Sequence, residues 1–302
     1  MRDTEEDKPA HFSCCRKIKP DSSGPGEEEA ELFFQGWQQP EGGENSKAAI
    51  CLVHGLGEHS GRYDHVADFF LEHDISLLGF DLYGHGRSAG KRGNAPSYQF
   101  ILSTLQLLVD TAAEKFPGLP LYLYGHSLGG NLALNYALRN NCEKLRGLIL
   151  TSPWLKLVQK PARPVQMLAG LIYRLYPDLT LSSGLKAEDL SQSKDTRQNY
   201  KEDELVHDRI SLRLYLESAR AGRRALENPD ELDGLNLPVL ILHGEDDKIT
   251  DPAASRSLAD GLNEAGKHCE YQEYEGLLHE LHNSRQREQV LQQIAEFIHR
   301  NR

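Results

Sequence analysis

A serine framed by glycines is the first residue of this sequence whose surroundings suggest catalysis. Residues 125–129 read Gly-His-Ser-Leu-Gly, which matches the G-x-S-x-G pattern of a nucleophile elbow. An apolar run, 121–124, precedes this pentapeptide, and a segment with helical spacing, 128–139, follows it. A tight turn between strand and helix exposes the serine hydroxyl at the carboxyl edge of a sheet. This context favours a nucleophile at Ser127 over a glycine-rich helix start.

A serine hydroxyl is a weak nucleophile unless a base removes its proton and a carboxylate orients that base. After an elbow of this kind, the acid and then the histidine follow in the chain, each on a loop after a later strand. His279, just past a predicted strand at 270–274, is the candidate base, whereas His282 is expected to be a capping or surface residue. The acid candidates follow a predicted strand at 239–242 and are Glu245, Asp246 and Asp247. An ordinary solvated turn is the alternative for this acidic trio.

Acyl transfer also needs an oxyanion hole, which is built from backbone N–H groups rather than side chains. The residue after the nucleophile, Leu128, is expected to supply one donor. The second donor should come from a loop after an early strand, and residues 54–57, His-Gly-Leu-Gly, follow the apolar run 51–53. We assign this second donor to Leu56, because the neighbouring glycines let the backbone approach a substrate closely.

Neither a metal nor a cofactor is expected. Residues 279–282, His-Glu-Leu-His, lack the H-E-x-x-H spacing that places two histidines one helical turn apart. Residues 55–62 contain glycines without the Gly-Lys-Ser/Thr of a phosphate loop.

Length and charge exclude several classes of protein. The 302 residues are 39% hydrophobic and carry a formal charge of -11, which argues against disorder and against a nucleic-acid partner. No apolar run approaches the roughly 20 residues of a membrane span, and the first residues lack the pattern of a signal peptide. The five cysteines are odd in number and form no C-x-x-C pair, as expected for reduced thiols of a cytoplasmic protein. The oligomeric state is left open.

Apolar runs and helical periodicity alternate along most of the chain. This alternation predicts an α/β fold with a mostly parallel central sheet and helices on both faces. The predicted strands are 48–53, 75–80, 121–124, 145–151, 239–243 and 270–274, with an edge element at 32–37, and the main helices are 97–116, 128–139, 253–265 and 285–299. We divide the chain into a disordered charged tail (1–29), a first core part (30–152), a helical cap (153–231) and a second core part (232–302).

The cap region contains no convincing strand but one amphipathic helix, residues 164–176. Its apolar residues share one face and are Val165, Leu168, Leu171, Ile172 and Leu175. We expect Leu168 and Ile172 to cover the acyl chain of a substrate. Ordinary core packing of this face is an equal alternative, and transient contact with a lipid interface is a third.

Four segments together resemble the monoacylglycerol lipase family, which includes bacterial lysophospholipases, within the α/β-hydrolase superfamily. They are residues 54–63 (HGLGEHSGRY), 84–88 (GHGRS), 125–129 and 274–279. The resemblance runs from about residue 33 to residue 298 and is weakest in the cap. It implies a triad of Ser127, Asp247 and His279 with Leu56 and Leu128 as oxyanion donors. It also implies that Glu58, Arg62 and His126 line the polar end of the pocket, near the glycerol group.

The expected function is hydrolysis of monoacylglycerols or similar single-chain acyl esters, which are small-molecule substrates, through an acyl-enzyme. A lysophospholipase, a short-chain esterase or an aminopeptidase would share every catalytic residue, so these alternatives stay open. Acyl transfer to an alcohol or amine also stays open. A non-catalytic binding module is disfavoured because all three triad members are present. A dehalogenase or epoxide hydrolase with an aspartate nucleophile is disfavoured because serine occupies the elbow.

Overall fold

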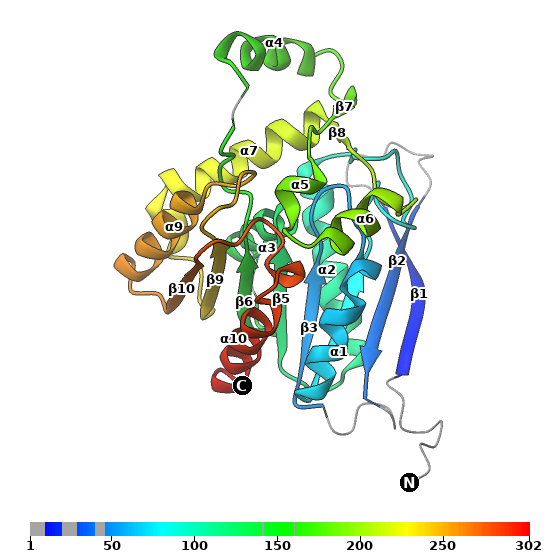
Figure 1. The fold of residues 1–302 in the computed structure, drawn as a ribbon, viewed down its shortest axis with the longest axis vertical. Coiled ribbons are helices and arrows are strands. Elements are labelled where there is room, and N and C mark those ends of the chain that lie inside the picture. The colour runs from blue at the N-terminus through cyan, green and yellow to red at the C-terminus, as the bar shows by residue number, and fades with distance from the viewer. Residues whose placement is uncertain (1–9, 20–28, 40–45, 141, 160) are drawn as a thin grey trace.

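An eight-stranded sheet forms the centre of the computed structural model, which describes residues 10–19, 29–39, 46–140, 142–159 and 161–302 (Figure 1). The strand order is β1-β2-β4-β3-β5-β6-β9-β10. The last six strands of this order are mutually parallel, whereas β1 and β2 are antiparallel to their neighbours. The strands are β1 (Ala10–Ile18), β2 (Ala30–Gln38), β3 (Ala48–Val53), β4 (Ile75–Phe80), β5 (Leu121–His126), β6 (Leu145–Thr151), β9 (Val239–Gly244) and β10 (Cys269–Tyr274).

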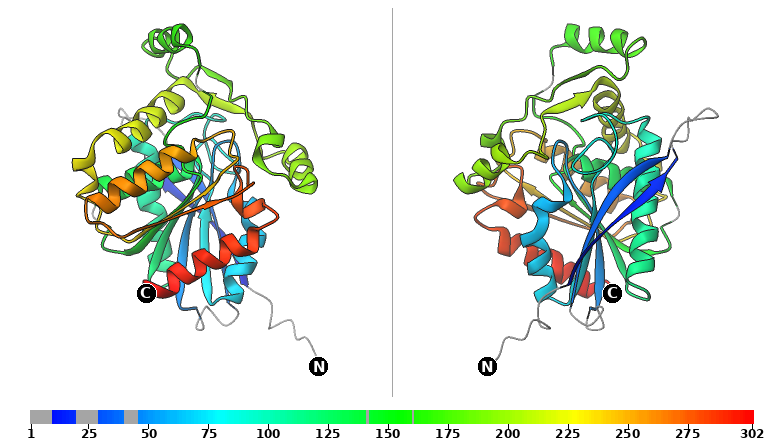
Figure 2. Two further views of the ribbon diagram at one scale, coloured as in Figure 1. Left: turned by 60° about the vertical axis from the view of Figure 1, so that its left-hand side comes forward. Right: turned by 90° about the vertical axis from the view of Figure 1, so that its right-hand side faces the viewer.

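Helices cover both faces of this sheet and create two hydrophobic cores (Figure 2). One core lies under α1 (Asp64–Glu72) and α10 (Arg287–Arg300), and the other lies under α2 (Tyr98–Lys115), α3 (Leu128–Arg139) and α9 (Pro252–Glu264). Because both faces are covered, every residue of β3, β4, β5 and β9 is buried, as their unbroken apolar runs indicated. The predicted α/β architecture is therefore confirmed.

The N-terminal region differs from its prediction as a disordered tail. Residues 10–18 form β1, which pairs with β2 along its full length. Alternate residues of β1 turn toward the protein, and the Phe12 ring lies over Gly36, where a Cβ would come within 2.3 Å of it, and faces Phe116 with ring centroids 6.4 Å apart. Period-two spacing of Ala10, Phe12, Cys14 and Ile18 was the available signal. The remaining residues of the predicted tail, 1–9 and 20–28, lie outside the described part.

The inserted cap lies between β6 and β9, over the carboxyl ends of the parallel strands (Figure 1). It is mostly helical, as predicted, but it also contains an antiparallel two-stranded ribbon that the sequence did not indicate. Each ribbon strand has three residues, too few to show a period of two. The cap elements are α4 (Arg163–Tyr173), β7 (Thr180–Ser182), α5 (Ala187–Leu190), α6 (Lys194–Glu202), β8 (Arg209–Ser211), α7 (Leu212–Glu227) and α8 (Pro229–Leu232).

Over the described ranges, no helix has both the length and the apolarity to cross a bilayer.

Candidate active site

Ser127 occupies the single position between the end of β5 and the start of α3. Its φ of 55° and ψ of -116° are unusual for a residue with a side chain, and such strain typically costs about 1–3 kcal/mol. The flanking glycines permit this turn. A Cβ on Gly125 would lie 2.3 Å from the Gly129 carbonyl oxygen, and a Cβ on Gly129 would lie 2.1 Å from the Val53 carbonyl oxygen. The backbone thus packs closely on both sides of the elbow and leaves room only for glycine at these two positions.

The structure brings three of the predicted residues into a hydrogen-bonded chain. The Oγ of Ser127 is 2.8 Å from Nε2 of His279, and Nδ1 of His279 is 2.7 Å from Oδ2 of Asp247. Asp247 lies on the loop after β9, and His279 lies on the loop after β10. Among the competing carboxylates of the described residues, Asp247 is buried, whereas Glu245 and Asp246 are exposed. The side chains of these two residues form no hydrogen bond with Ser127 or His279.

Asp247 is surrounded by donors that hold it as a carboxylate. Its Oδ1 accepts the backbone N–H groups of Ile249 at 2.8 Å and Thr250 at 3.1 Å. Its Oδ2 accepts the Thr250 hydroxyl at 2.8 Å and lies 3.1 Å from Nε2 of His243. Burial alone would raise the pKa of Asp247, but His279 and His243 outweigh burial and hold this pKa far below its usual range. His243 and Thr250 were not predicted, because supporting donors carry no motif of their own.

His279 is buried, and burial by itself favours the neutral imidazole. The charge and hydrogen bond of Asp247, together with the carboxylates of Glu280 and Glu58, outweigh this effect and hold the pKa of His279 above its ordinary value. The ring centroids of His126 and His279 are 4.9 Å apart, and burial keeps the pKa of His126 well below the usual value. The surroundings of His279 therefore stabilise its protonated form, the imidazolium.

A pH profile tests this electrostatic arrangement. The predicted base, His279, can accept a proton only when neutral, so kcat/KM should fall as the pH drops, with a midpoint above the ordinary histidine value of about 6.5. Glu280→Gln removes one carboxylate that raises this pKa and should move the midpoint to lower pH. Initial rates with a soluble ester from about pH 5 to pH 9 measure both midpoints, and the exposed Glu275→Gln variant is the matched control. A wild-type midpoint below 6.5 would contradict the arrangement.

The two predicted oxyanion donors both lie next to Ser127. Leu128 begins α3, and Leu56 follows Gly55, whose Cα lies so close that an added Cβ would be 3.2 Å from the Ser127 Cβ. Among the hydrogen bonds of the described residues, neither the Leu56 nor the Leu128 N–H is donated to a protein acceptor. Both N–H groups are thus available to an oxyanion formed above Ser127.

A small polar cavity adjoins Ser127, and the predicted head-group residues lie around it. Its polar lining residues are Glu58, Arg62, His126, Tyr200, His279 and Glu280. Tyr200 and Glu280 were not predicted, since Tyr200 belongs to the cap and Glu280 is adjacent to the base. His282, expected as a capping or surface residue, is instead buried and stacks on Tyr63 with centroids 4.6 Å apart. Burial lowers the pKa of His282 to about 4.

A second cavity, of about 70 Å3 and mainly apolar lining, is also lined by Ser127. It is lined by Leu56, Trp154, Leu157, Leu185, Ile210 and Tyr215, with Ser183, Ile249 and Thr250. The predicted acyl-covering residues, Leu168 and Ile172, do not line it. They lie on α4, which extends away from the sheet and contains no buried residue (Figure 1). Neither core packing nor cover of the acyl chain therefore describes α4 in this structure.

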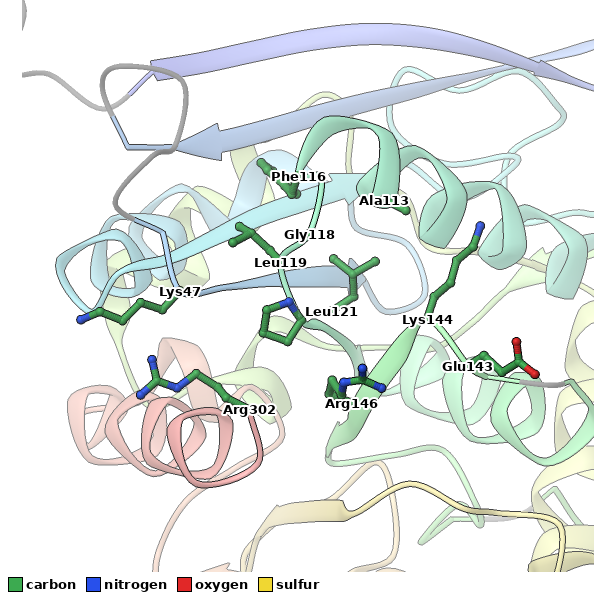
Figure 3. Close-up of a pocket in the computed structure, with 11 residues that line it drawn as sticks. Lys47, Ala113, Phe116, Gly118, Leu119, Leu121, Glu143, Lys144, Arg146 and Arg302 are labelled. Carbon is green, nitrogen blue, oxygen red and sulfur yellow. The ribbon is translucent and has the colours of Figure 1, made fainter.

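A larger groove than either of these cavities lies elsewhere, at the amino ends of β3, β5 and β6 (Figure 3). Its volume is about 620 Å3, and four cations, Lys47, Lys144, Arg146 and Arg302, surround an apolar floor. Lys47 and Lys144 pair with Asp74 and Asp110. The lining contains no serine, histidine or cysteine, so the groove offers no nucleophile. As for metals, the described segments contain no group of three histidine, cysteine or acidic side chains placed to hold an ion.

Comparisons with known proteins identify the family of this chain. The family described as serine aminopeptidase, S33, matches residues 44–286. An abhydrolase domain-containing protein of Dictyostelium discoideum is 35% identical over 252 residues, which are 83% of this chain but only 26% of that protein. The monoglyceride lipase of Homo sapiens is 30% identical over 83% of this chain and 80% of its own length. The crystal structure of a Paleococcus ferrophilus monoacylglycerol lipase superposes with a TM-score of 0.75 at 30% identity, covering 90% of this chain and 99% of that one.

Proposed function

Because this chain belongs to the serine aminopeptidase, S33, family of α/β-hydrolases and is a carboxylic ester hydrolase, we propose that it cleaves monoacylglycerols to a fatty acid and glycerol. The observation that carries the proposal is the hydrogen-bonded chain from Ser127 Oγ through His279 to Asp247, with a polar and an apolar cavity both lined by Ser127. A single-chain ester has the same division, with a polar head on one side of the reacting carbonyl and an acyl chain on the other.

The reaction proceeds through an acyl-enzyme. Nε2 of His279 takes the hydroxyl proton while Oγ of Ser127 attacks the ester carbonyl carbon. The N–H groups of Leu56 and Leu128 stabilise the resulting oxyanion. When the intermediate collapses, the glycerol oxygen leaves with the proton from His279. Water then attacks the acyl-enzyme, giving its proton to His279, and the Ser127 oxygen recovers that proton as the fatty acid departs.

The charge of the polar cavity favours a neutral head group. Glu58 and Glu280 face the single guanidinium of Arg62, so this buried group carries a formal charge of minus one. The whole chain carries a formal charge of -11. A phosphate on a lysophospholipid would meet like charge in this cavity, whereas the hydroxyl groups of glycerol would find hydrogen-bond partners. This supports monoacylglycerols over lysophospholipids.

A substrate panel tests the proposed function. One preparation of enzyme is assayed with monoacylglycerols, lysophospholipids, p-nitrophenyl esters and aminoacyl amides of matched acyl or side-chain size. We expect monoacylglycerols to give the highest kcat/KM among the natural classes. A higher value for lysophospholipids or aminoacyl amides would reject the substrate assignment without touching the triad. A parallel assay with added alcohol separates hydrolysis from acyl transfer, because transfer yields a new ester instead of free acid.

Exposed apolar residues gather in one part of the cap, and we propose that they make transient contact with a lipid interface. All the large hydrophobic side chains exposed in the described residues fall between positions 158 and 181: Val158, Val165, Met167, Leu168, Leu171, Leu175, Tyr176, Leu179 and Leu181. A patch of this kind on a monomer indicates an interaction surface. The acidic charge of the chain favours a neutral over an anionic interface.

Charging this patch should affect emulsified and dissolved substrates differently. Leu168 and Leu171 are 55% and 61% exposed, so Leu168→Asp with Leu171→Asp should leave the fold intact. We expect activity on an emulsified long-chain monoacylglycerol to fall at least tenfold, since insertion of each leucine contributes roughly 1.5–3 kcal/mol. Hydrolysis of dissolved p-nitrophenyl butyrate should not change. Gln166→Asp, on the same helix, is the matched control, and equal losses on both substrates would reject the interfacial role.

We also propose that the protein acts in the cytoplasm. Its cysteines are five in number, all of them are free thiols in the structure, and Cys51 is fully buried within β3. This pattern is typical of a protein folded in a reducing compartment.

A further inference from the structure

The Arg62 side chain, next to the candidate active site, forms hydrogen bonds and ion pairs with two carboxylates. Its Nη1 and Nη2 donate to Oε1 and Oε2 of Glu280 at 2.8 and 2.9 Å, which is the bidentate geometry of a strong arginine–carboxylate pair. Nη1 also donates to Oε2 of Glu58 at 2.7 Å. The side chains of Arg62, Glu58 and Glu280 are only 9%, 3% and 2% exposed. The guanidinium is therefore held between two buried carboxylates rather than turned toward a substrate.

Each of these carboxylates belongs to a different part of the catalytic machinery. Oε1 of Glu58 accepts the Gly55 N–H at 2.6 Å and the Tyr63 hydroxyl at 2.9 Å, and Gly55 immediately precedes the oxyanion donor Leu56. Glu280 immediately follows the base His279. The path from the oxyanion segment to the histidine segment therefore runs Gly55, Glu58, Arg62, Glu280, with a hydrogen bond at every step. These segments are more than 200 positions apart in the sequence.

We propose that Arg62 is a positioning residue that holds the oxyanion segment (residues 55–58) and the histidine segment (residues 279–280) at a fixed separation. The proposal rests on the proposed roles of Leu56 and His279 and differs from the head-group contact that the family resemblance implied for Arg62. Stabilising the transition state requires that the oxyanion donors and the base are both correctly placed at the same time. A misplacement of about 1 Å can lower the rate on the order of 10²-fold. A single planar guanidinium with fixed donor directions suits this task better than a flexible ammonium.

The cap meets the same group from above. The Tyr200 ring of α6 lies with its centroid 5.0 Å from Cζ of Arg62, and the Glu280 N–H donates to the Leu190 carbonyl of α5 at 2.8 Å. Two cap helices thus rest on the clamp formed by Glu58, Arg62 and Glu280. Correct seating of the cap and correct spacing of the catalytic segments depend on one set of contacts.

Two substrates with the same acyl group separate positioning from head-group binding. p-Nitrophenyl butyrate and monobutyrin form the same acyl-enzyme, but only monobutyrin has a glycerol leaving group. Arg62→Lys keeps the charge and loses the bidentate geometry, and it should lower kcat about tenfold on both substrates while KM stays within twofold. Arg62→Met should lower kcat about 10²-fold on both. All values are expressed per active site titrated with a fluorophosphonate, so partial misfolding does not imitate a slow enzyme.

A control variant and three possible outcomes distinguish positioning by Arg62 from the alternatives. Arg256→Met removes the ion pair between Arg256 on α9 and Glu273 on β10 and should leave both rates unchanged. A rise in KM confined to monobutyrin would overturn the proposal and assign Arg62 to the glycerol group, and unchanged kcat in Arg62→Lys and Arg62→Met would overturn it outright. If Arg62→Met does not fold, Arg62→Lys and Glu280→Gln decide, each with the expected tenfold loss on both substrates. A wild type that fails to cleave monobutyrin would reject the proposed function, while the p-nitrophenyl arm would still test the clamp.

Discussion

Replacing Ser127 by alanine should lower kcat for ester cleavage about 10⁶-fold, as expected when the nucleophile of a hydrogen-bonded triad is lost. Oγ of Ser127 is the atom that His279 Nε2 faces at 2.8 Å, and alanine leaves no atom there to form the acyl-enzyme. The loss should appear in kcat rather than in KM, because the two cavities beside the elbow remain. Any remaining rate would come from the oxyanion donors and from binding.

The measurement needs evidence that the variant is folded. Alanine keeps a Cβ at the same positive φ, so thermal unfolding of Ser127→Ala should stay within a few degrees of the wild type. A fluorophosphonate probe should label the wild type and the control Ser103→Ala, whose hydroxyl donates to the Phe100 carbonyl on α2, but not Ser127→Ala. Ester cleavage by highly purified Ser127→Ala at more than about 1% of the wild-type rate would reject Ser127 as the nucleophile.

Neutralising Asp247 should give the second-largest loss, about 10⁴-fold in kcat for Asp247→Asn. An asparagine amide can present an N–H to His279 Nδ1, which favours the wrong imidazole tautomer and leaves Nε2 unable to accept the serine proton. The carboxylate also stabilises the imidazolium, and this stabilisation would be lost with the charge.

The neighbouring aspartate supplies the matched control. Asp246→Asn makes the same chemical change at the adjacent position, but that side chain is exposed, so kcat should stay within about twofold of the wild type. Steady-state kinetics with p-nitrophenyl butyrate at one pH compare both variants directly. A severe effect of Asp246→Asn with a mild effect of Asp247→Asn would transfer the role of the acid to Asp246.

Patterns among neighbouring residues predicted much of the fold and the position of the serine elbow. β3 and β5 were predictable because both faces of a central parallel strand are covered, which makes the run of apolar residues continuous. The elbow was predictable because its tight backbone requires glycine at positions 125 and 129, and that requirement leaves a readable pentapeptide. In each case the structural constraint acts on residues that are neighbours in the chain.

Other features depended on contacts between distant residues. The amphipathic spacing of α4 correctly indicated a helix, but the same pattern fits a buried, a substrate-facing or an exposed face, and the helix proved to be exposed. Strand β1 combines its spacing with charged residues such as Arg16, so it becomes stable only through pairing with β2. His282 likewise gives no local sign that it lies buried against Tyr63.

The amino-acid sequence by itself therefore determined which reactive groups the protein contains. These are a serine on an elbow, a histidine and acids after later strands, and backbone N–H donors after the elbow serine and after an early strand. Residue types and short-range periodicity carry this information, because strands and helices impose spacings of two and about 3.6 residues on neighbours in the chain. Only the tertiary structure decided which groups meet. It brought Asp247, the acid that the family resemblance implied, to His279, placed Arg62 between Glu58 and Glu280, and left α4 outside the apolar cavity. These choices depend on packing between segments that are far apart in sequence, and no local spacing specifies such packing.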